Sequence, residues 1–287
     1  MVRPMPDVAG VSHRQVRVGD IELHVAEAGE GEPVLLLHGW PQHWYVWRHV
    51  IPRLAERWRV ICPDLRGLGW SDAPPSGYEK EELAADVLRL MDAMELDRVR
   101  LIAHDWGGFV GFLLCLHVPE RIQGFLVMNT GHPWTEVGAK ELLQIYRLWY
   151  QFVLSTPILG QAAARPLVNM TYRVAVNKKR VTREEWSQYV EQFREPARKH
   201  ATVAIYRSFL LRELPAIGRG RYLDRRLTVP TLFLLGEGDP VIQPEMIESA
   251  LPHADDMTLE TVPDTGHFIA DELPELVSER ALSFLGS

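Results

Sequence analysis

Short apolar runs recur along the chain and predict strands that are buried on both faces. The runs lie at Val34–Leu37, Arg59–Cys62, Arg98–Ala103, Phe125–Asn129 and Thr231–Leu235. Runs of this kind are typical of the inner strands of a parallel sheet. Residues 14–28 instead alternate polar and apolar positions around Gly19-Asp20, which predicts two strands. Met257–Val262 is a weaker eighth candidate.

Segments with helical spacing separate these runs. Residues 81–96 bring Leu83, Val87, Leu90 and Met94 to one face of a helix, and residues 106–117 and 274–284 show similar spacing. Strand and helix alternate up to residue 130 and again from residue 231. This alternation predicts an α/β protein with a mostly parallel, eight-stranded sheet and flanking helices.

The interval 132–226 has a different pattern. It is rich in Tyr, Trp and Arg, has no short apolar runs, and predicts helices at 137–154, 161–176, 183–194 and 198–213. We therefore expect a core domain formed by residues 1–131 and 227–287, with 132–226 inserted as a helical cap. The cap is expected over the carboxyl edge of the sheet, where ligands bind in open α/β sheets.

Composition narrows the possible partners and compartments. Apolar residues make up 46% of the 287 residues, charged residues 24%, and the formal net charge is −7. An acidic balance argues against nucleic acid, whose phosphates require clustered Lys and Arg. The longest apolar stretch, Phe109–Val118, is too short to span a bilayer, and residues 1–14 have no apolar segment of a signal peptide. Two cysteines within apolar runs, Cys62 and Cys115, favour a reducing, cytoplasmic location. Oligomeric state is left open.

A tight turn follows the run that ends at Ala103. The sequence Ala103-His104-Asp105-Trp106-Gly107 has small residues two positions before and two after Asp105, and a helical segment follows directly. This spacing is typical of a nucleophile elbow. A carboxylate nucleophile attacks an sp³ carbon that bears a leaving group and forms an alkyl ester of the enzyme. The alternative is that Asp105 only caps the next helix, as Asp often does.

Two later loops offer an acid and a base. Asp239 follows the run at 231–235, and His267 follows the last predicted strand. The order nucleophile, acid, histidine is that of the α/β-hydrolase fold, so we expect His267 to act as general base and Asp239 to orient its ring. The backbone N–H groups of Trp40 and Trp106 are the expected oxyanion hole. No metal-ligand spacing is visible, and this chemistry requires no metal or organic cofactor.

Together these motifs resemble the α/β-hydrolase-fold epoxide hydrolases and, more loosely, the haloalkane dehalogenases. The resemblance covers nearly the whole chain and rests on His38-Gly39-Trp40-Pro41, His104-Asp105-Trp106-Gly107-Gly108, Asp239 and His267. In the epoxide hydrolases two cap tyrosines donate hydrogen bonds to the epoxide oxygen. The matching positions here are Tyr146, which precedes Trp149-Tyr150-Gln151, and Tyr206, which precedes Arg207. Tyr150 is the alternative to Tyr146.

The resemblance implies a small-molecule epoxide as the substrate and a vicinal diol as the product. A phenol with a pKa of about 10 keeps its proton at neutral pH and can stabilise the alkoxide, whereas a halide needs only N–H donors. The expected substrate-binding residues are Trp40, Trp106, Trp149 and Tyr150. Two alternatives remain at this point: a haloalkane dehalogenase that uses the same triad, and a ligand receptor that keeps the pocket without rapid turnover.

Overall fold

The apolar runs form a single eight-stranded sheet. The computed structural model describes residues 4–135, 145–176 and 180–286. Its strands are β1 (Ser12–Val18), β2 (Ile21–Ala28), β3 (Pro33–Leu37), β4 (Arg59–Pro63), β5 (Val99–His104), β6 (Ile122–Met128), β7 (Thr231–Gly236) and β8 (Met257–Val262). They lie in the order β1-β2-β4-β3-β5-β6-β7-β8. All eight strands therefore match predicted ones, including the weak candidate at 257–262.

The strand pairing is mostly parallel, as predicted. β1 and β2 pair antiparallel, β2 meets β4 antiparallel, and every pairing from β4 to β8 is parallel. In the centre, Leu35 of β3 lies between Ile61 of β4 and Leu101 of β5, and all three side chains are fully buried. An uninterrupted apolar run is required there because helices cover both faces.

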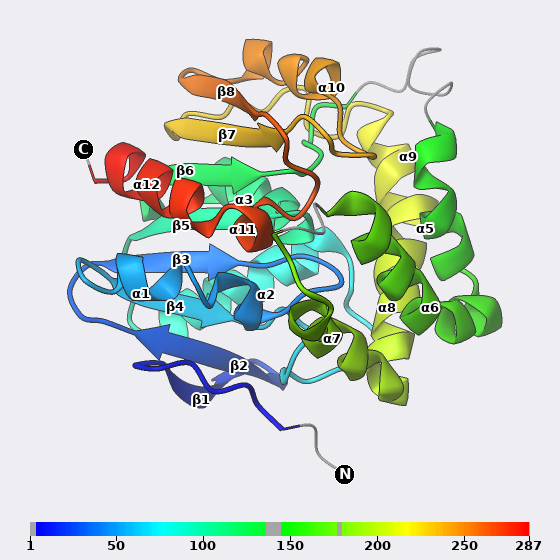
Figure 1. Ribbon diagram of the computed structural model, residues 1–287. Helices are drawn as coiled ribbons and strands as arrows, with labels where there is room; N and C mark the ends of the chain where they lie inside the picture. Colours follow the sequence, from blue (N-terminus) through cyan, green and yellow to red (C-terminus); the bar gives the residue numbers. More distant parts are fainter. Residues whose placement is uncertain (1–3, 136–144, 177–179, 287) are drawn as a thin grey trace.

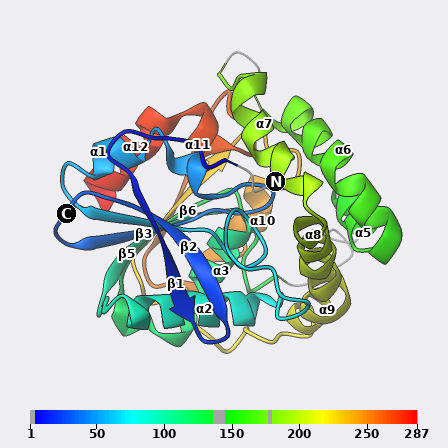
Figure 2. The same cartoon turned by 90° about the horizontal axis from the view of Figure 1, so that it is seen from below.

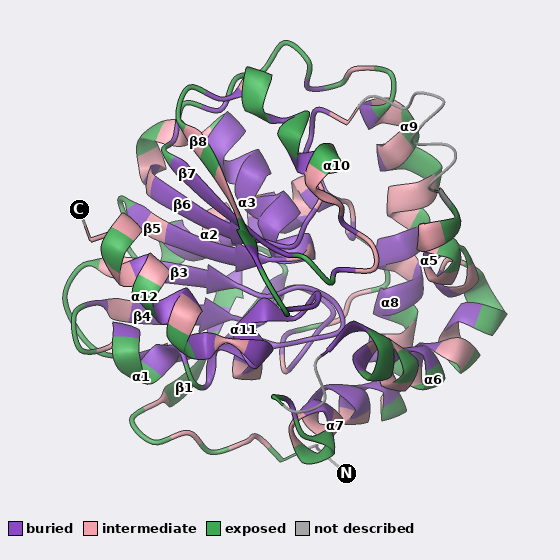
Figure 3. Ribbon diagram, turned by 45° about the horizontal axis from the view of Figure 1, so that its top comes forward, coloured by how far each residue is buried: buried purple, intermediate pink, exposed green. Residues whose placement is uncertain are grey.

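Helices cover the two faces of the sheet in two groups (Figures 1 and 2). The helices α1 (Ile51–Leu54), α11 (Ile269–Glu272) and α12 (Pro274–Phe284) lie on one face. The opposite face is covered by α2 (Lys80–Ala93) and α3 (Trp106–His117). Helix α3 is apolar on all sides and buried along almost its whole length (Figure 3). A helix of this kind belongs in the interior of the protein.

A group of helices connects β6 to β7 and lies beyond the carboxyl ends of the strands (Figure 1). It contains η3 (Ile145–Leu148), α5 (Trp149–Leu154), α6 (Pro157–Ala175), α7 (Arg183–Glu191), η4 (Gln192–Arg194), α8 (Pro196–Ser208), the π-helical segment η5 (Phe209–Glu213) and α9 (Leu214–Ile217). The predicted helices agree with these bounds to within a few residues, and 137–144 lies outside the described residues. The boundaries of a separate cap domain at 132 and 226 stay a prediction.

Several short elements have no counterpart in the prediction. They are α1, α11, α10 (Pro244–Glu248) and the 3₁₀ turns η1 (Trp44–Trp47), η2 (Pro119–Arg121) and η6 (Leu251–His253). Helices of three to five residues complete about one turn, so they show no periodic apolar face for the sequence to reveal. Helix α6 begins four residues earlier than predicted, at Pro157, because proline is well suited to the first helical position.

No helix in the described ranges is long and apolar enough to cross a bilayer. Cys62 and Cys115 are both buried free thiols.

Candidate active site

Asp105 lies at the sharp turn between β5 and α3. Its backbone has φ 50° and ψ −126°, a conformation that a residue with a side chain seldom adopts. The turn also brings α3 against the end of β3, where a Cβ on Gly107 would collide with the carbonyl oxygens of Leu37 and His38. A Cβ on Gly39 would collide with the Asp105 carboxylate. Gly39 and Gly107 are therefore required because neighbouring atoms around Asp105 leave no room for a Cβ at either position.

The structure brings the three residues of the expected triad together. His267 Nδ1 lies 2.7 Å from Asp239 Oδ2, and His267 Nε2 lies 3.5 Å from Asp105 Oδ2. Asp239 is held in turn by the backbone N–H groups of Val241 and Ile242, which donate to its Oδ1 at 2.8 and 3.1 Å. The loops after β5, β7 and β8 thus meet at one edge of the sheet.

Burial and neighbouring charges have opposite effects on the pKa values of His267 and Asp239. Burial lowers the pKa of His267, but the Asp239 and Asp105 carboxylates outweigh it and raise that pKa to about 10. Burial raises the pKa of Asp239, and His267 outweighs burial and holds that pKa below its ordinary value. His267 is therefore a charged imidazolium at neutral pH, between two carboxylates.

The turn after β3 supplies a backbone donor to the nucleophile. The Trp40 N–H donates to Asp105 Oδ1 at 2.8 Å, and the Trp40–Pro41 peptide bond is cis. Trp106 opens α3, so its N–H is one of the first-turn groups that have no partner within the helix. The Trp40 N–H thus contacts the Asp105 carboxylate, and the oxyanion role of both N–H groups stays a prediction.

The two other histidines near the site support the backbone. Burial and the neighbouring His267 lower the pKa of His104 to about 4, so its ring is neutral, and its Nε2–H donates to the His267 carbonyl at 2.8 Å. His38 Nδ1–H donates to the carbonyl of Gly39, and its Nε2 accepts from the N–H of Leu65. Both rings therefore hold the loops around Asp105 through backbone contacts.

Two tyrosines of the helical segment face each other above the nucleophile. Tyr206 of α8 is buried at 1% exposure, with its ring 5.2 Å from that of Trp40 and 6.0 Å from that of Tyr150 in α5. The two rings pack edge to face. Burial raises the pKa of both phenols, so both keep their protons at neutral pH and can act as donors.

The choice of Tyr146 as the first tyrosine is not supported by its position. The Tyr146 side chain is 65% exposed and does not line the cavity that contains Asp105, whereas Tyr150 does. Tyr146 lies in the 3₁₀ turn η3, one turn before α5, so its direction differs from that of Tyr150. The structure thus favours the alternative named from the sequence.

A cavity of about 220 Å³ lies between Asp105 and the helical segment. It is lined by Trp40, Asp105, Arg147, Trp149, Tyr150, Met170, Thr171, Val174, Ala175, Tyr206, Pro240, Val241, His267 and Phe268. Trp149 lies at its rim, half exposed. The indole of Trp106 is not part of the lining, which corrects its expected role in substrate binding. That ring packs instead on Phe209, and the buried ammonium of Lys80 lies 4.3 Å from its centroid.

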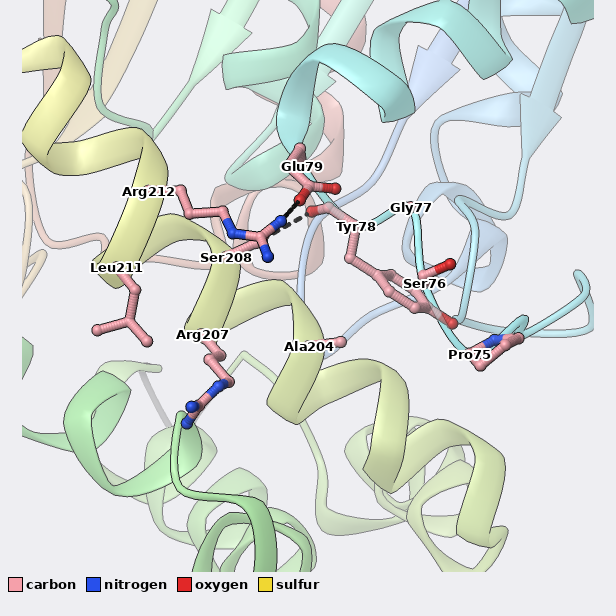
Figure 4. A pocket seen from close by; sticks show the side chains of 10 residues that line it. All are labelled: Pro75, Ser76, Gly77, Tyr78, Glu79, Ala204, Arg207, Ser208, Leu211 and Arg212. Carbon is pink, nitrogen blue, oxygen red and sulfur yellow. Dashed lines mark hydrogen bonds and ion pairs between the residues drawn. The ribbon is translucent and has the colours of Figure 1, made fainter.

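A second hollow, of about 290 Å³, lies between residues 75–79 and the end of α8 (Figure 4). Arg212 Nη1 donates to Glu79 Oε1 across it at 2.6 Å, and Ser208 Oγ donates to the Tyr78 carbonyl. It shares no lining residue with the cavity above Asp105. We assign no chemistry to this hollow.

Three residues of the site were not predicted from the sequence. Asn129 Nδ2 donates to Asp239 Oδ2 at 2.7 Å, and its position at the end of an apolar run was the only available signal. Phe268 and Arg147 line the cavity, and neither has a pattern that marks it in the sequence. Within the described ranges no group of three His, Cys, Asp or Glu residues is arranged to hold a metal ion.

Comparison with known proteins now identifies the family. A family model described as the alpha/beta hydrolase fold matches residues 32–274. This chain belongs to the α/β-hydrolase fold family. This α/β hydrolase is 30% identical to epoxide hydrolase 4 of Mus musculus, over 96% of the chain and 79% of that protein. It is 29% identical to the soluble epoxide hydrolase of Corynebacterium sp. (strain C12), over 96% of the chain and 97% of that protein.

Solved structures agree with this placement. The α/β hydrolase superposes on wild-type Cfl2 from Burkholderia cenocepacia with a TM-score of 0.85, at 28% identity and 98% coverage of each chain. The unliganded epoxide hydrolase CorEH matches with a TM-score of 0.83, at 27% identity, over 96% of this chain and 99% of that one. Within the fold family, the chain therefore lies in the epoxide hydrolase branch.

Proposed function

We propose that this α/β hydrolase converts an epoxide and water to a vicinal diol through an alkyl ester on Asp105. The observation that carries the proposal is the opposition of two groups across one cavity. Asp105 lines it from the carboxyl end of the sheet, and Tyr150 and Tyr206 line it from the helices between β6 and β7. An epoxide needs both a nucleophile and an acid, because alkoxide is a poor leaving group.

The first step forms the ester. A carboxylate oxygen of Asp105 attacks one ring carbon, the bond from that carbon to the epoxide oxygen breaks, and a tyrosine hydroxyl protonates the released oxygen. Tyr150 and Tyr206 line the same cavity as Asp105, and their rings pack edge to face. Ring strain in the epoxide favours opening, and the two donors stabilise the negative charge as it develops on oxygen.

The second step hydrolyses the ester. Once Asp105 is esterified, its negative charge no longer contributes to the raised pKa of His267, so His267 gives up its proton more readily. That proton returns to the tyrosine that protonated the epoxide oxygen. The neutral ring then takes a proton from water, and the water oxygen attacks the carboxyl carbon of Asp105. The N–H groups of Trp40 and Trp106 stabilise the oxyanion; the bond between the carboxyl carbon and the substrate oxygen then breaks, the released alkoxide takes the proton of the new carboxyl group, and the diol leaves.

One contact argues against the dehalogenase alternative. Halide release requires N–H donors that point into the cavity. The Trp40 indole donates to Thr202 Oγ1 at 3.1 Å, and Trp106 is not among the lining residues. The Trp40 indole is therefore occupied within the protein, whereas Tyr150 and Tyr206 both line the cavity and can serve an epoxide oxygen.

The test follows diol formation from a terminal epoxide and bromide release from an alkyl bromide, with Asp105→Ala as the control. We expect diol without bromide, and no diol from the variant. A single turnover in water enriched in heavy oxygen tests the ester directly, because the label should enter Asp105 rather than the diol. Label in the first diol would contradict the ester, and bromide without diol would favour the dehalogenase.

The cellular setting also belongs to the proposal. The acidic composition and the two buried thiols, Cys62 and Cys115, support a cytoplasmic enzyme whose partner is a small molecule rather than nucleic acid or a membrane. Fractionation of the producing cells, with activity followed in each fraction, tests the location.

A further inference from the structure

Arg147 differs from the rest of the cavity wall. It is the only arginine or lysine among the lining residues, and most of the others are apolar or aromatic, such as Met170, Val174 and Val241. It lies in η3, just before the helix that carries Tyr150. A cation among mostly apolar and aromatic side chains requires an explanation, because desolvation of a charge is costly.

The hydrogen bonding of Arg147 is incomplete. Its Nη1 donates to the Pro240 carbonyl at 2.8 Å, and its guanidinium lies 5.6 Å from the ring centroid of Tyr146. Its Nε is buried and has no hydrogen-bond partner, and no carboxylate of the described residues lies within ion-pair distance. The Arg147 guanidinium therefore has donors that the described protein groups leave unused.

Two buried arginines of this chain have carboxylate partners, which Arg147 lacks. Arg48 pairs with Asp271 and Glu185, and Arg66 makes two hydrogen bonds to Asp86. The planar guanidinium presents neighbouring N–H groups that match the two oxygens of a carboxylate. Arg147 lines the cavity and has no such carboxylate partner among the described residues.

We propose that the preferred substrate is an epoxide that also carries a carboxylate, which Arg147 binds while the epoxide ring lies at Asp105. The apolar wall between these two points suits a hydrocarbon chain that joins the two groups. The cavity volume of about 220 Å³ limits that chain to a short one. This inference rests on the proposed epoxide hydrolysis and specifies its substrate class. Arg147 binds the substrate and takes no part in the bond changes.

The test uses a matched pair of substrates, a terminal epoxide whose chain ends in a carboxylate and the carboxamide of equal length. We expect the protein to prefer the acid in kcat/KM. Arg147→Met should lower the ratio of acid to amide by about ten- to hundredfold, mainly through KM, because an ion-paired hydrogen bond is lost. Arg147→Lys keeps the positive charge but lacks the planar guanidinium, so it should retain part of the preference for the acid.

The control is Arg165→Met, which removes an arginine of α6 that pairs with Glu191 outside the cavity. The ratio of kcat/KM for the acid to that for the amide should be the same in Arg165→Met as in the unaltered protein. An unaltered protein that turns over the amide without preferring the acid would overturn the carboxylate inference and leave epoxide hydrolysis intact. An equal loss for both substrates in Arg147→Met would also overturn it, because Arg147 would then only connect η3 to the Pro240 loop. Failure to turn over either epoxide would overturn the proposed function itself.

Discussion

At the scale of single residues, the site depends on groups whose charges are set by their neighbours. His267 is charged because Asp105 and Asp239 lie on either side of it, and His104, next to Asp105 in the chain, is neutral because burial dominates there. Burial and the nearby Asp105 carboxylate raise the pKa of Tyr150 and Tyr206, so both phenols stay protonated. Each of these protonation states should change when a neighbouring residue is substituted, so substitutions test them.

Substitution of the tyrosines separates the two that face the cavity from the one that does not. Tyr150→Phe and Tyr206→Phe should each lower kcat for an epoxide by roughly ten- to hundredfold, because one donor to the developing alkoxide is lost. Tyr146→Phe should stay within about twofold of the unaltered protein, since a largely exposed hydroxyl has no contact with the epoxide. Steady-state kinetics measure all three. A large loss in Tyr146→Phe alone would return the role to the residue that the sequence favours.

The raised pKa of His267 also predicts a dependence of stability on pH. The folded pKa of about 10 lies above the unfolded value of 6.5, so the charged ring stabilises the folded state. That contribution is fully present below pH 6.5 and disappears as the pH rises through 10. Urea unfolding of the protein and of His267→Gln should show a difference in free energy that shrinks over this interval. A difference independent of pH would mean that the ring is neutral in the folded protein.

At the scale of elements, the strand-turn-helix unit at Asp105 depends on how closely α3 approaches β3. The backbone of Gly107 lies against the carbonyl groups of Leu37 and His38, so the helix can begin there only if no Cβ is present. The strained backbone of Asp105 is maintained by this packing.

Gly107→Ala should therefore destabilise the protein by about 1–3 kcal/mol, because overpacking forces backbone shifts. Gly131→Ala is the matched control, since a Cβ at that position meets no atom within 4 Å. Its free energy of unfolding should equal or slightly exceed that of the unaltered protein. Chemical denaturation of both variants measures the difference, and equal stabilities would show that the turn relaxes to admit the methyl group.

At the scale of the whole molecule, buried polar contacts join the helices between β6 and β7 to the sheet domain. Arg48, just after η1, donates to Asp271 of α11 at 2.5 Å and to Glu185 of α7 at 2.7 Å, and Tyr189 of α7 also donates to Asp271. These contacts fix α7 against the core. The position of α8, and with it Tyr206, relative to Asp105 depends on such connections.

Arg48→Met should cost about 3–5 kcal/mol of stability, because it leaves the buried carboxylate of Asp271 without its cation. Arg194→Met removes an arginine from an exposed pair with Glu191 and should change stability by less than about 1 kcal/mol. Thermal and urea unfolding check both values. A small effect in Arg48→Met would mean that Asp271 becomes protonated at little cost.

The sequence alone determined the sheet, its mostly parallel pairing, and the order of Asp105, Asp239 and His267. These follow from local information: an apolar run buried on two faces, small residues around a tight turn, and polar residues directly after strands. The tertiary structure alone decided which tyrosines face the cavity, that the Trp106 indole packs away from it, and that Asn129 and Arg147 join the site. Those facts depend on side-chain direction and on contacts between residues far apart in the chain, such as the 110 positions between Asn129 and Asp239. The spacing of residues within one segment does not show which residues of a distant segment will pack beside it.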